Sequence, residues 1–232
     1  PNSYKPKTSS IIMALIIGID DAGRGPVLGP MILAGVLIEE KDNETLKTWG
    51  AKDSKLLTPK RRKEIKENII NQFPYHIEIS QPKEIDESSN LNYTEAIKAA
   101  MIVNKLTENL NEKVSVIIDC PSVNLQAWQA DVPKLLDKPE IVSLSCEHKA
   151  DFNHPSVSAA SIIAKEKRED EVTRLKQELD INFGSGYPAD PKTKEFIAEN
   201  FDNPKYKELI RFSWNTVKKL VKAADENQKK LF

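Results

Sequence analysis

Aspartates follow three short apolar segments of this chain, and this pattern restricts the fold more than any other feature of the sequence. The predicted strands are 14–19, followed by Asp20 and Asp21, 114–119, which ends in Asp119, and 141–145, followed after a short segment by Asp151. Apolar runs of this length are typical of buried strands. In open α/β sheets, functional groups gather beside the strand ends, so carboxylates from separate strands can meet there. The sequence therefore predicts an α/β fold with acids gathered at one edge of its sheet.

The remaining patterns predict two more strands and several long helices, with the last third of the chain mainly helical. Strands are expected at 31–39 and 75–80, and helices at 59–72, 91–110, 157–179, 191–201 and 213–230. Thr58 is the expected N-cap of the first of these helices, and Met101 is expected on the buried side of the second. We divide the chain into a flexible tail (1–12), an α/β domain (13–190) and a C-terminal helical extension packed on the same domain (191–232).

The composition excludes some classes of protein and favours others. With 34 Lys and Arg against 35 Asp and Glu, the net charge of −1 shows no overall excess of basic residues for binding nucleic acid. No apolar run approaches the ~18 residues of a transmembrane helix, and the polar first ten residues do not resemble a signal peptide. Two cysteines, Cys120 and Cys146, fit a reducing compartment better than a disulfide framework. We therefore expect a monomer in the cytoplasm.

The gathered acids suggest a site for hard divalent cations. Neighbouring carboxylates repel one another, and Mg²⁺ offsets that repulsion while binding carboxylate and phosphate oxygens. Two such ions about 3.5–4 Å apart can activate a water molecule and stabilise the leaving oxygen of a phosphodiester. The alternative for each acid is an ordinary role in a loop or helix cap.

Glycine is scarce in this chain and concentrated near the first acids. Five of the eight glycines lie between Gly18 and Gly35, and Gly23-Arg24-Gly25 follows the acidic pair closely. Glycines let a backbone approach a ligand, and an arginine between them suits phosphate. The alternative is a plain turn between two strands.

Six segments resemble, in the order in which they occur, those of the type 2 ribonuclease H family (ribonuclease HII) in its archaeal form. They are GIDDAGRGPVLGP (18–30), KDSKLLTPKRR (52–62), VIIDCPSVN (116–124), EHKADFNHPSVSAASIIAK (147–165), GSGYPADPKT (184–193) and RFSWNTVKK (211–219). The resemblance implies that 13–190 is an RNase H-like catalytic domain with a mixed five-stranded sheet flanked by helices. It also implies an endoribonuclease that uses two Mg²⁺ or Mn²⁺ ions. Such an enzyme hydrolyses the phosphodiester 5′ of a ribonucleotide in RNA–DNA hybrids and at single ribonucleotides in duplex DNA, during replication and repair.

The resemblance also implies roles for individual residues. Asp20, Asp21, Asp119 and Asp151 match the catalytic, metal-binding acids, and Gly23, Arg24 and Gly25 match the turn whose backbone reads the ribose 2′-OH. Tyr187 matches a residue that stacks beside the nucleotide after the ribose, Lys55 matches one near the cleaved phosphate, and Asn92 matches one that touches the duplex. One position departs from the family, because Asp21 stands where its members normally carry Glu. We hypothesise weaker occupancy of one metal position, or a preference for Mn²⁺.

Two further segments suggest contacts outside this set. Residues 47–66 hold eight basic and two acidic residues, which favours a phosphate-tracking surface over a merely solvated helix face. Gln228, Leu231 and Phe232 resemble the start of a sliding-clamp binding motif, with a frayed helix end as the alternative. His148 and His154 flank Asp151 and are expected to support it as polar or capping groups.

Two other functions remain open at this stage. Another nuclease of the same superfold, such as a junction resolvase, would share the acids without needing the glycine turn or the tyrosine loop. A catalytically weakened, clamp-tethered binder of ribonucleotide-containing DNA would follow if Asp21 abolished turnover.

Overall fold

The computed structural model describes residues 14–51, 57–88, 90–120, 122 and 124–229, with side chains described as far as Glu226. The predicted tail (1–12), Lys55, Leu231, Phe232 and the Gln228 side chain therefore lie outside the described residues.

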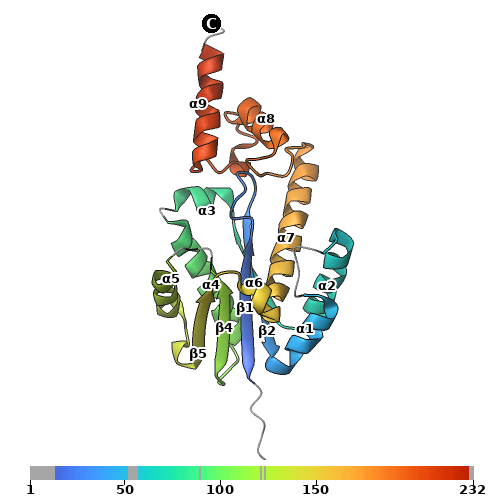
Figure 1. Cartoon of the computed structure of the whole chain (residues 1–232). Coiled ribbons are helices and arrows are strands. Elements are labelled where there is room, and N and C mark those ends of the chain that lie inside the picture. Colours follow the sequence, from blue (N-terminus) through green and yellow to red (C-terminus); the bar gives the residue numbers. More distant parts are fainter. Residues whose placement is uncertain (1–13, 52–56, 89, 121, 123, 230–232) are drawn as a thin grey trace, which may run out of the picture.

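A mixed five-stranded sheet forms the centre of the protein, as the resemblance implied (Figure 1). Its strands are β1 (Leu15–Ala22), β2 (Met31–Glu39), β3 (Tyr75–Ser80), β4 (Val114–Asp119) and β5 (Val142–Glu147). Their order across the sheet is β3-β2-β1-β4-β5. Strand β1 pairs antiparallel with β2 and parallel with β4, and β4 pairs parallel with β5. The C-terminal ends of β1, β4 and β5 consequently share one edge of the sheet.

Helices connect the strands and form the C-terminal part of the chain. The described α-helices are α1 (Asn43–Trp49), α2 (Pro59–Gln72), α3 (Pro82–Glu87), α4 (Leu91–Thr107), α5 (Leu125–Asp131), α6 (Ala150–Asn153), α7 (Pro155–Leu179), α8 (Pro191–Asn200) and α9 (Asn215–Lys229). Short 3₁₀ segments are η1 (Glu40–Asp42), η2 (Val132–Leu135), η3 (Pro139–Ile141) and η4 (Lys207–Leu209). Among the described helices, none is long and apolar enough to span a membrane.

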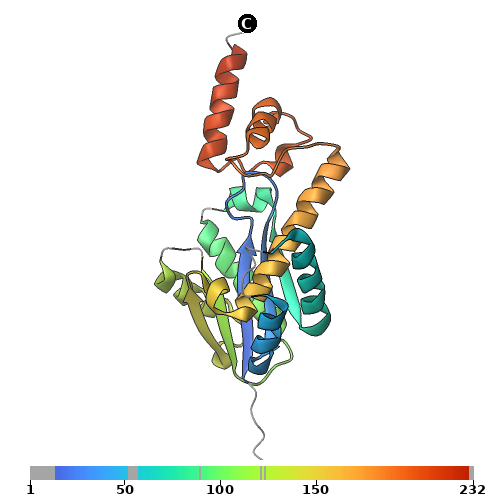
Figure 2. The same ribbon diagram turned by 45° about the vertical axis from the view of Figure 1, so that its right-hand side comes forward.

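The sheet is covered on both faces, and the alternation of side chains along β1 explains how. Ile17 and Ile19 point into the core beneath α4 and α5, whereas Ile16 packs in the core beneath α1, α2 and α7. Successive residues of a strand face opposite sides of a sheet, so an apolar run without polar interruptions is what a strand buried on both faces requires. In Figure 2, the N-terminal part of α7 crosses the second face, where Ala159, Ala160 and Ile162 pack.

Gly18 allows the closest approach between the sheet and α7. A methyl group at this position would overlap the backbone of Ser156 and Val157, neither of which can rotate away. We expect Gly18→Ala to lower the free energy of unfolding by about 3 kcal/mol, the upper range for overpacking a core. Urea unfolding measures the loss. Gly25→Ala is the matched control, because its methyl group would meet only a Tyr187 ring carbon, at 3.7 Å. Equal losses in both variants would contradict this account of the packing.

The C-terminal helices are attached to the turn between β1 and β2. Leu28 pairs with Ile210 in an isolated bridge, and both belong to a third apolar core built largely from residues after 170. Asp86 accepts hydrogen bonds from the backbone amides of Phe212 at 2.7 Å and Ser213 at 2.9 Å. Arg211 is fully buried and donates to the Gly29 carbonyl at 2.9 Å. The position of the turn therefore depends on the C-terminal part.

Several sequence predictions of local structure need correction. Asp20 and Asp21 lie inside β1 rather than after it, because β1 continues to pair with β2 through Ala22. Helix α4 ends at Thr107 rather than at residue 110, and Met101 is 43% exposed instead of buried. The patterns also missed the short helices α1, α3, α5 and α6. Thr58 does cap α2, since its side chain accepts from the Arg61 amide.

The basic stretch 47–66 is less available to phosphate than its composition indicates. Among its described residues, Arg62 pairs with Glu166 and with Glu169, the latter at 2.5 Å. Lys66 pairs with Asp170 at 3.1 Å. Lys47 and Arg61 pair within their own helices. The ion pairs of Arg62 and Lys66 attach α2 to α7, so much of this charge has a structural use.

Candidate active site

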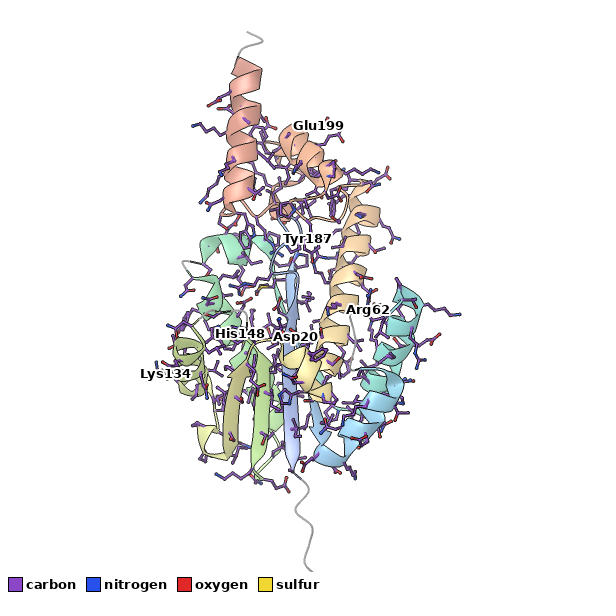
Figure 3. All side chains as sticks on the ribbon, in the orientation of Figure 1. Asp20, Arg62, Lys134, His148, Tyr187 and Glu199 are labelled. Atoms are coloured by element: carbon purple, nitrogen blue, oxygen red, sulfur yellow. The ribbon has the colours of Figure 1, made fainter. Side chains whose placement is uncertain are left out.

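Three of the four predicted acids meet at the C-terminal edge of the sheet. Ile19 on β1 is the register partner of Ile118 on β4, so Asp20 and Asp119, the residues that follow, lie side by side. Lys149 has a φ of 58°, a left-handed conformation that turns the chain from β5 into α6 and carries Asp151 to the same place. Carboxylate oxygens of Asp20, Asp119 and Asp151 all lie within 4.8 Å of one another. Figure 3 shows Asp20 near the middle of the molecule.

These acids form a buried and electrostatically unfavourable cluster. Asp20 is 6% exposed and Asp151 is 8% exposed. Burial, followed by the negative charges of Asp21 and Asp119, raises the pKa of Asp20 well above its usual value. A divalent cation would remove this penalty, and a set made only of carboxylate oxygens is the donor set that Mg²⁺ and Mn²⁺ prefer. The residues present therefore fit a hard metal ion.

Asp21, the fourth predicted acid, leaves β1 on the other side of the strand from Asp20 and lies beside the cluster. Side chains alternate along β1, so Asp21 points toward the α4 side of the strand, but at the strand end it lines one small cavity together with Asp20, Asp119 and Glu95. Burial raises the pKa of Asp21 to about 6, with Arg24 and Lys165 opposing the rise and Asp119 adding to it. Asp21 is thus close enough to sense the cluster electrostatically, but it is not one of the three acids whose oxygens converge.

The glycine turn lies directly beyond the acids and is held from inside the protein. Gly23 has a φ of 90° and packs against the Arg168 side chain, so a larger residue would not fit. Arg24 directs its guanidinium inward, with Nη1 donating to the Glu95 carboxylate and Nη2 donating to Asn92 Oδ1 at 2.7 Å. Gly25 is exposed. Both terminal nitrogens of the guanidinium are thus engaged by α4, while the Arg24 side chain remains 32% exposed.

Asn92 joins this network from the first turn of α4. Its side-chain nitrogen donates to Ser122 Oγ at 3.4 Å, and its backbone carbonyl accepts from Trp128 Nε1 at 2.9 Å. Its side-chain oxygen accepts from Arg24. Both groups of the Asn92 side chain are thereby engaged within the protein.

Tyr187 stands beside the turn with much of its ring exposed. The ring is 44% exposed, and the Arg168 guanidinium lies 5.2 Å from its centroid. The preceding residue, Gly186, accepts a hydrogen bond from the Val27 amide at 2.8 Å, which ties the tyrosine loop to the glycine turn. Figure 3 shows Tyr187 between Asp20 and the C-terminal helices. An exposed aromatic ring next to an exposed backbone turn is suited to stacking on a nucleotide.

The two histidines make polar contacts at the ends of β4 and β5. His148 Nδ1 lies 3.1 Å from the Cys120 carbonyl oxygen, and His154 Nε2 lies 2.9 Å from Glu147 Oε2. Both cysteines are buried and free.

Sequence reasoning missed three residues at this site, namely Glu95, Lys165 and Arg168. Glu95 had one local signal, since it follows Asn92 by three residues and so shares its face of α4. Lys165 ends the matched segment 147–165 but was given no role, and Arg168 lies outside the matched segments.

Comparison with known proteins places this geometry in context. The family model described as Ribonuclease HII matches residues 17–217. A ribonuclease HII of Methanococcus maripaludis is 40% identical over 219 residues, covering 92% of this chain and 90% of that protein. The crystal structure of ribonuclease H2 from Pyrococcus horikoshii OT3 superposes with a TM-score of 0.79 at 36% identity, covering 91% of this chain and 99% of that one. The structure of the PCNA:RNase HII complex from Archaeoglobus fulgidus superposes with a TM-score of 0.76 at 33% identity, covering 87% of this chain and 95% of that one.

Proposed function

Because the chain belongs to the ribonuclease HII family of metal-dependent hydrolases that act on RNA in RNA–DNA hybrids, we propose that it is an endoribonuclease that cleaves on the 5′ side of a ribonucleotide. Its substrates are RNA–DNA hybrids and duplex DNA that contains single ribonucleotides. Its role is in the removal of ribonucleotides during DNA replication and repair. The observation that carries this proposal is the glycine turn immediately beyond the carboxylate cluster, exposed at Gly25, because it puts backbone groups for reading a ribose next to groups for cutting its phosphate.

Asp20, Asp119 and Asp151 would hold the metal, with Asp21 contributing from the cavity that it shares with Asp20 and Asp119. We propose two ions, Mg²⁺ or Mn²⁺. Such ions supply activation of a water nucleophile and charge stabilisation for the leaving oxygen.

The remaining site residues bind and orient the duplex in this proposal. Backbone groups of Gly23, Arg24 and Gly25 hydrogen-bond the 2′-OH, which is the atom that distinguishes RNA from DNA. Tyr187 stacks near the following nucleotide, and Asn92 supports the turn at the edge of the duplex. Lys55, which lies outside the described residues, contacts the phosphate near the cut.

The proposal extends to the rest of the chain and its partners. Residues 13–190 form the catalytic domain, with 191–232 packed on it as a helical extension, and the protein acts as a cytoplasmic monomer. The Archaeoglobus fulgidus relative is described in a complex with PCNA. By analogy, we propose that Gln228, Leu231 and Phe232 bind a sliding clamp.

Cleavage of a 5′-labelled duplex with one embedded ribonucleotide, beside an identical all-DNA duplex, tests the function. We expect cutting of the first duplex only, and only with a divalent cation. Cutting of all-DNA four-way junctions instead would favour a resolvase. Tight binding of the ribonucleotide duplex without cleavage at saturating Mn²⁺ would favour a non-catalytic binder.

The aspartate at position 21 leads to a separate prediction about the metal preference. Its side chain is one methylene shorter than the Glu that the family normally carries, and Mg²⁺ tolerates little deviation from Mg–O distances of about 2.1 Å. We expect Asp21→Glu to raise kcat with Mg²⁺ by roughly tenfold, the scale on which outer ligand groups alter activity, and to change kcat with Mn²⁺ less. Steady-state cleavage rates in the two metals measure the difference, and equal effects in both would refute the idea.

A further inference from the structure

We propose that Glu95 is a positioning residue for ribose recognition, because its buried carboxylate binds the Arg24 guanidinium to α4 and so fixes the backbone of the glycine turn. This inference rests on the proposed function. It adds Glu95, which is not one of the three converging acids, to the residues that carry that function. Glu95 itself touches neither the scissile phosphate nor the ribose in this account.

The contacts of Arg24 carry the first step of the argument. Both terminal nitrogens of its guanidinium are engaged by one helix, Nη1 by the Glu95 carboxylate and Nη2 by Asn92 Oδ1 at 2.7 Å. The two acceptors are three residues apart on α4 and therefore share one face of that helix. A planar guanidinium gripped at two points has little freedom to rotate. Arg24 thus connects the turn rigidly to α4.

The burial of Glu95 carries the second step. Its side chain is 1% exposed, and burial raises its pKa to about 7 even though Arg24 opposes the rise. The second carboxylate oxygen, Oε1, has no hydrogen-bond partner among the described residues. A buried acid with one unsatisfied oxygen costs folding free energy, and an apolar residue of similar volume would be expected to stabilise this position more. Its presence is therefore better explained by the geometry it imposes on Arg24.

The backbone of the turn is fixed by the same arrangement. The Arg24 carbonyl accepts from Arg211 Nη1 at 3.2 Å, while its side chain is held by α4 on the other side. The neighbouring Gly25 remains exposed. With Arg24 clamped from both sides, the adjacent backbone groups have a defined direction toward a bound ribose. Discrimination between a 2′-OH and a hydrogen depends on that direction, because hydrogen bonds weaken steeply as their angle departs from linearity.

Affinity for two duplexes, one with a single ribonucleotide and one all-DNA, tests this role. Fluorescence anisotropy with Ca²⁺ replacing Mg²⁺ gives the two Kd values for the full-length protein, and their ratio is the ribose preference. We expect Glu95→Ala and Arg24→Ala each to reduce the preference by about tenfold, as for loss of a hydrogen bond to a charged group. The double variant should lose no more than either single one, because both remove the same contact. Glu95→Gln keeps an acceptor for Arg24 and should fall between wild type and Glu95→Ala.

Glu166→Gln is the matched control for general destabilisation. Glu166 is also fully buried, also pairs with an arginine (Arg62) and also has one unsatisfied oxygen, but it joins α2 to α7. The Glu166→Gln substitution should lower the Tm but leave the ribose preference equal to that of wild type. If the ribose preference of Glu95→Ala stays within about twofold of wild type, Glu95 has no positioning role. If Glu95→Ala does not fold, the same criterion applies to Glu95→Gln. Absence of any preference in wild type would overturn the proposed function and this inference together.

Discussion

Replacing Asp119 with Asn is expected to lower kcat for ribonucleotide-dependent cleavage by roughly 10²–10³-fold, the cost of deleting one preorganised electrostatic group from an active site. Asp119 is one of the three acids whose oxygens lie within 4.8 Å of one another, so the change removes both a ligand atom and negative charge from the metal site. Rapid-quench cleavage assays at saturating Mg²⁺ measure the loss. A matched thermal melt without metal should show a Tm no lower than wild type, because the substitution relieves repulsion of Asp20.

Glu147→Gln provides the control for this result. Glu147 is the register partner of Asp119 on the next strand, but its carboxylate pairs with His154 at 2.9 Å and it is not one of the converging acids. Its replacement should change kcat by less than about tenfold, the lower limit for groups that only support ligands. If Glu147→Gln impaired kcat as much as Asp119→Asn, catalysis would not be centred on the three-acid cluster.

The metal-free protein is expected to lose stability as the pH rises from about 4 to about 7, and divalent cations should reverse that loss. The pKa of Asp21 is raised from 3.8 to about 6 in the folded state, and that of Glu95 is raised from 4.5 to about 7, in both cases chiefly by burial. The pKa of Asp20 is also raised. Between the unfolded and folded pKa values, the folded protein binds more protons than the unfolded chain. Stability is therefore highest below the unfolded values and falls as the pH rises through the folded ones.

Thermal melts across this pH range, in EDTA and in Mg²⁺, measure the effect. Mg²⁺ should raise the Tm more at about pH 7 than at about pH 5, because a cation stabilises the ionised carboxylates. In Asp21→Asn the fall with pH should be shallower, since one of the responsible groups no longer titrates. A Tm in EDTA that rose over this range would show that the acids are not buried together in the metal-free protein.

Much of the fold follows from local sequence patterns. Strands β3 and β4 have the predicted bounds, and α2 begins at Pro59 after the predicted Thr58 cap. The patterns failed where the structure depends on distant partners. The apolar run of β1 stops at Ile19, but pairing with β2 continues the strand through both aspartates. The four missed helices have four to seven residues each, too few for a helical period to show.

The site was foreseen in its residue types more than in its contacts. The acids, the glycine turn and Tyr187 could be named from the sequence, but the face that Asp21 occupies follows only once β1 is known to include it. The contact between Arg24 and Glu95 spans 71 residues, and that between Arg62 and Glu166 spans 104. No local pattern encodes contacts of such length. Because of these contacts, the Arg24 guanidinium is bound to α4, and part of the basic stretch 47–66 forms ion pairs between α2 and α7.

The chemical ends left by cleavage test most directly the central proposal that water attacks the phosphate 5′ of a ribose recognised by the glycine turn. On a duplex with one ribonucleotide, mass spectrometry of the products should show a DNA fragment ending in a 3′-hydroxyl and a second fragment beginning with the ribonucleotide and a 5′-phosphate. A cut on the 3′ side that leaves a 2′,3′-cyclic phosphate would contradict the account, because the ribose 2′-OH itself would then be the nucleophile.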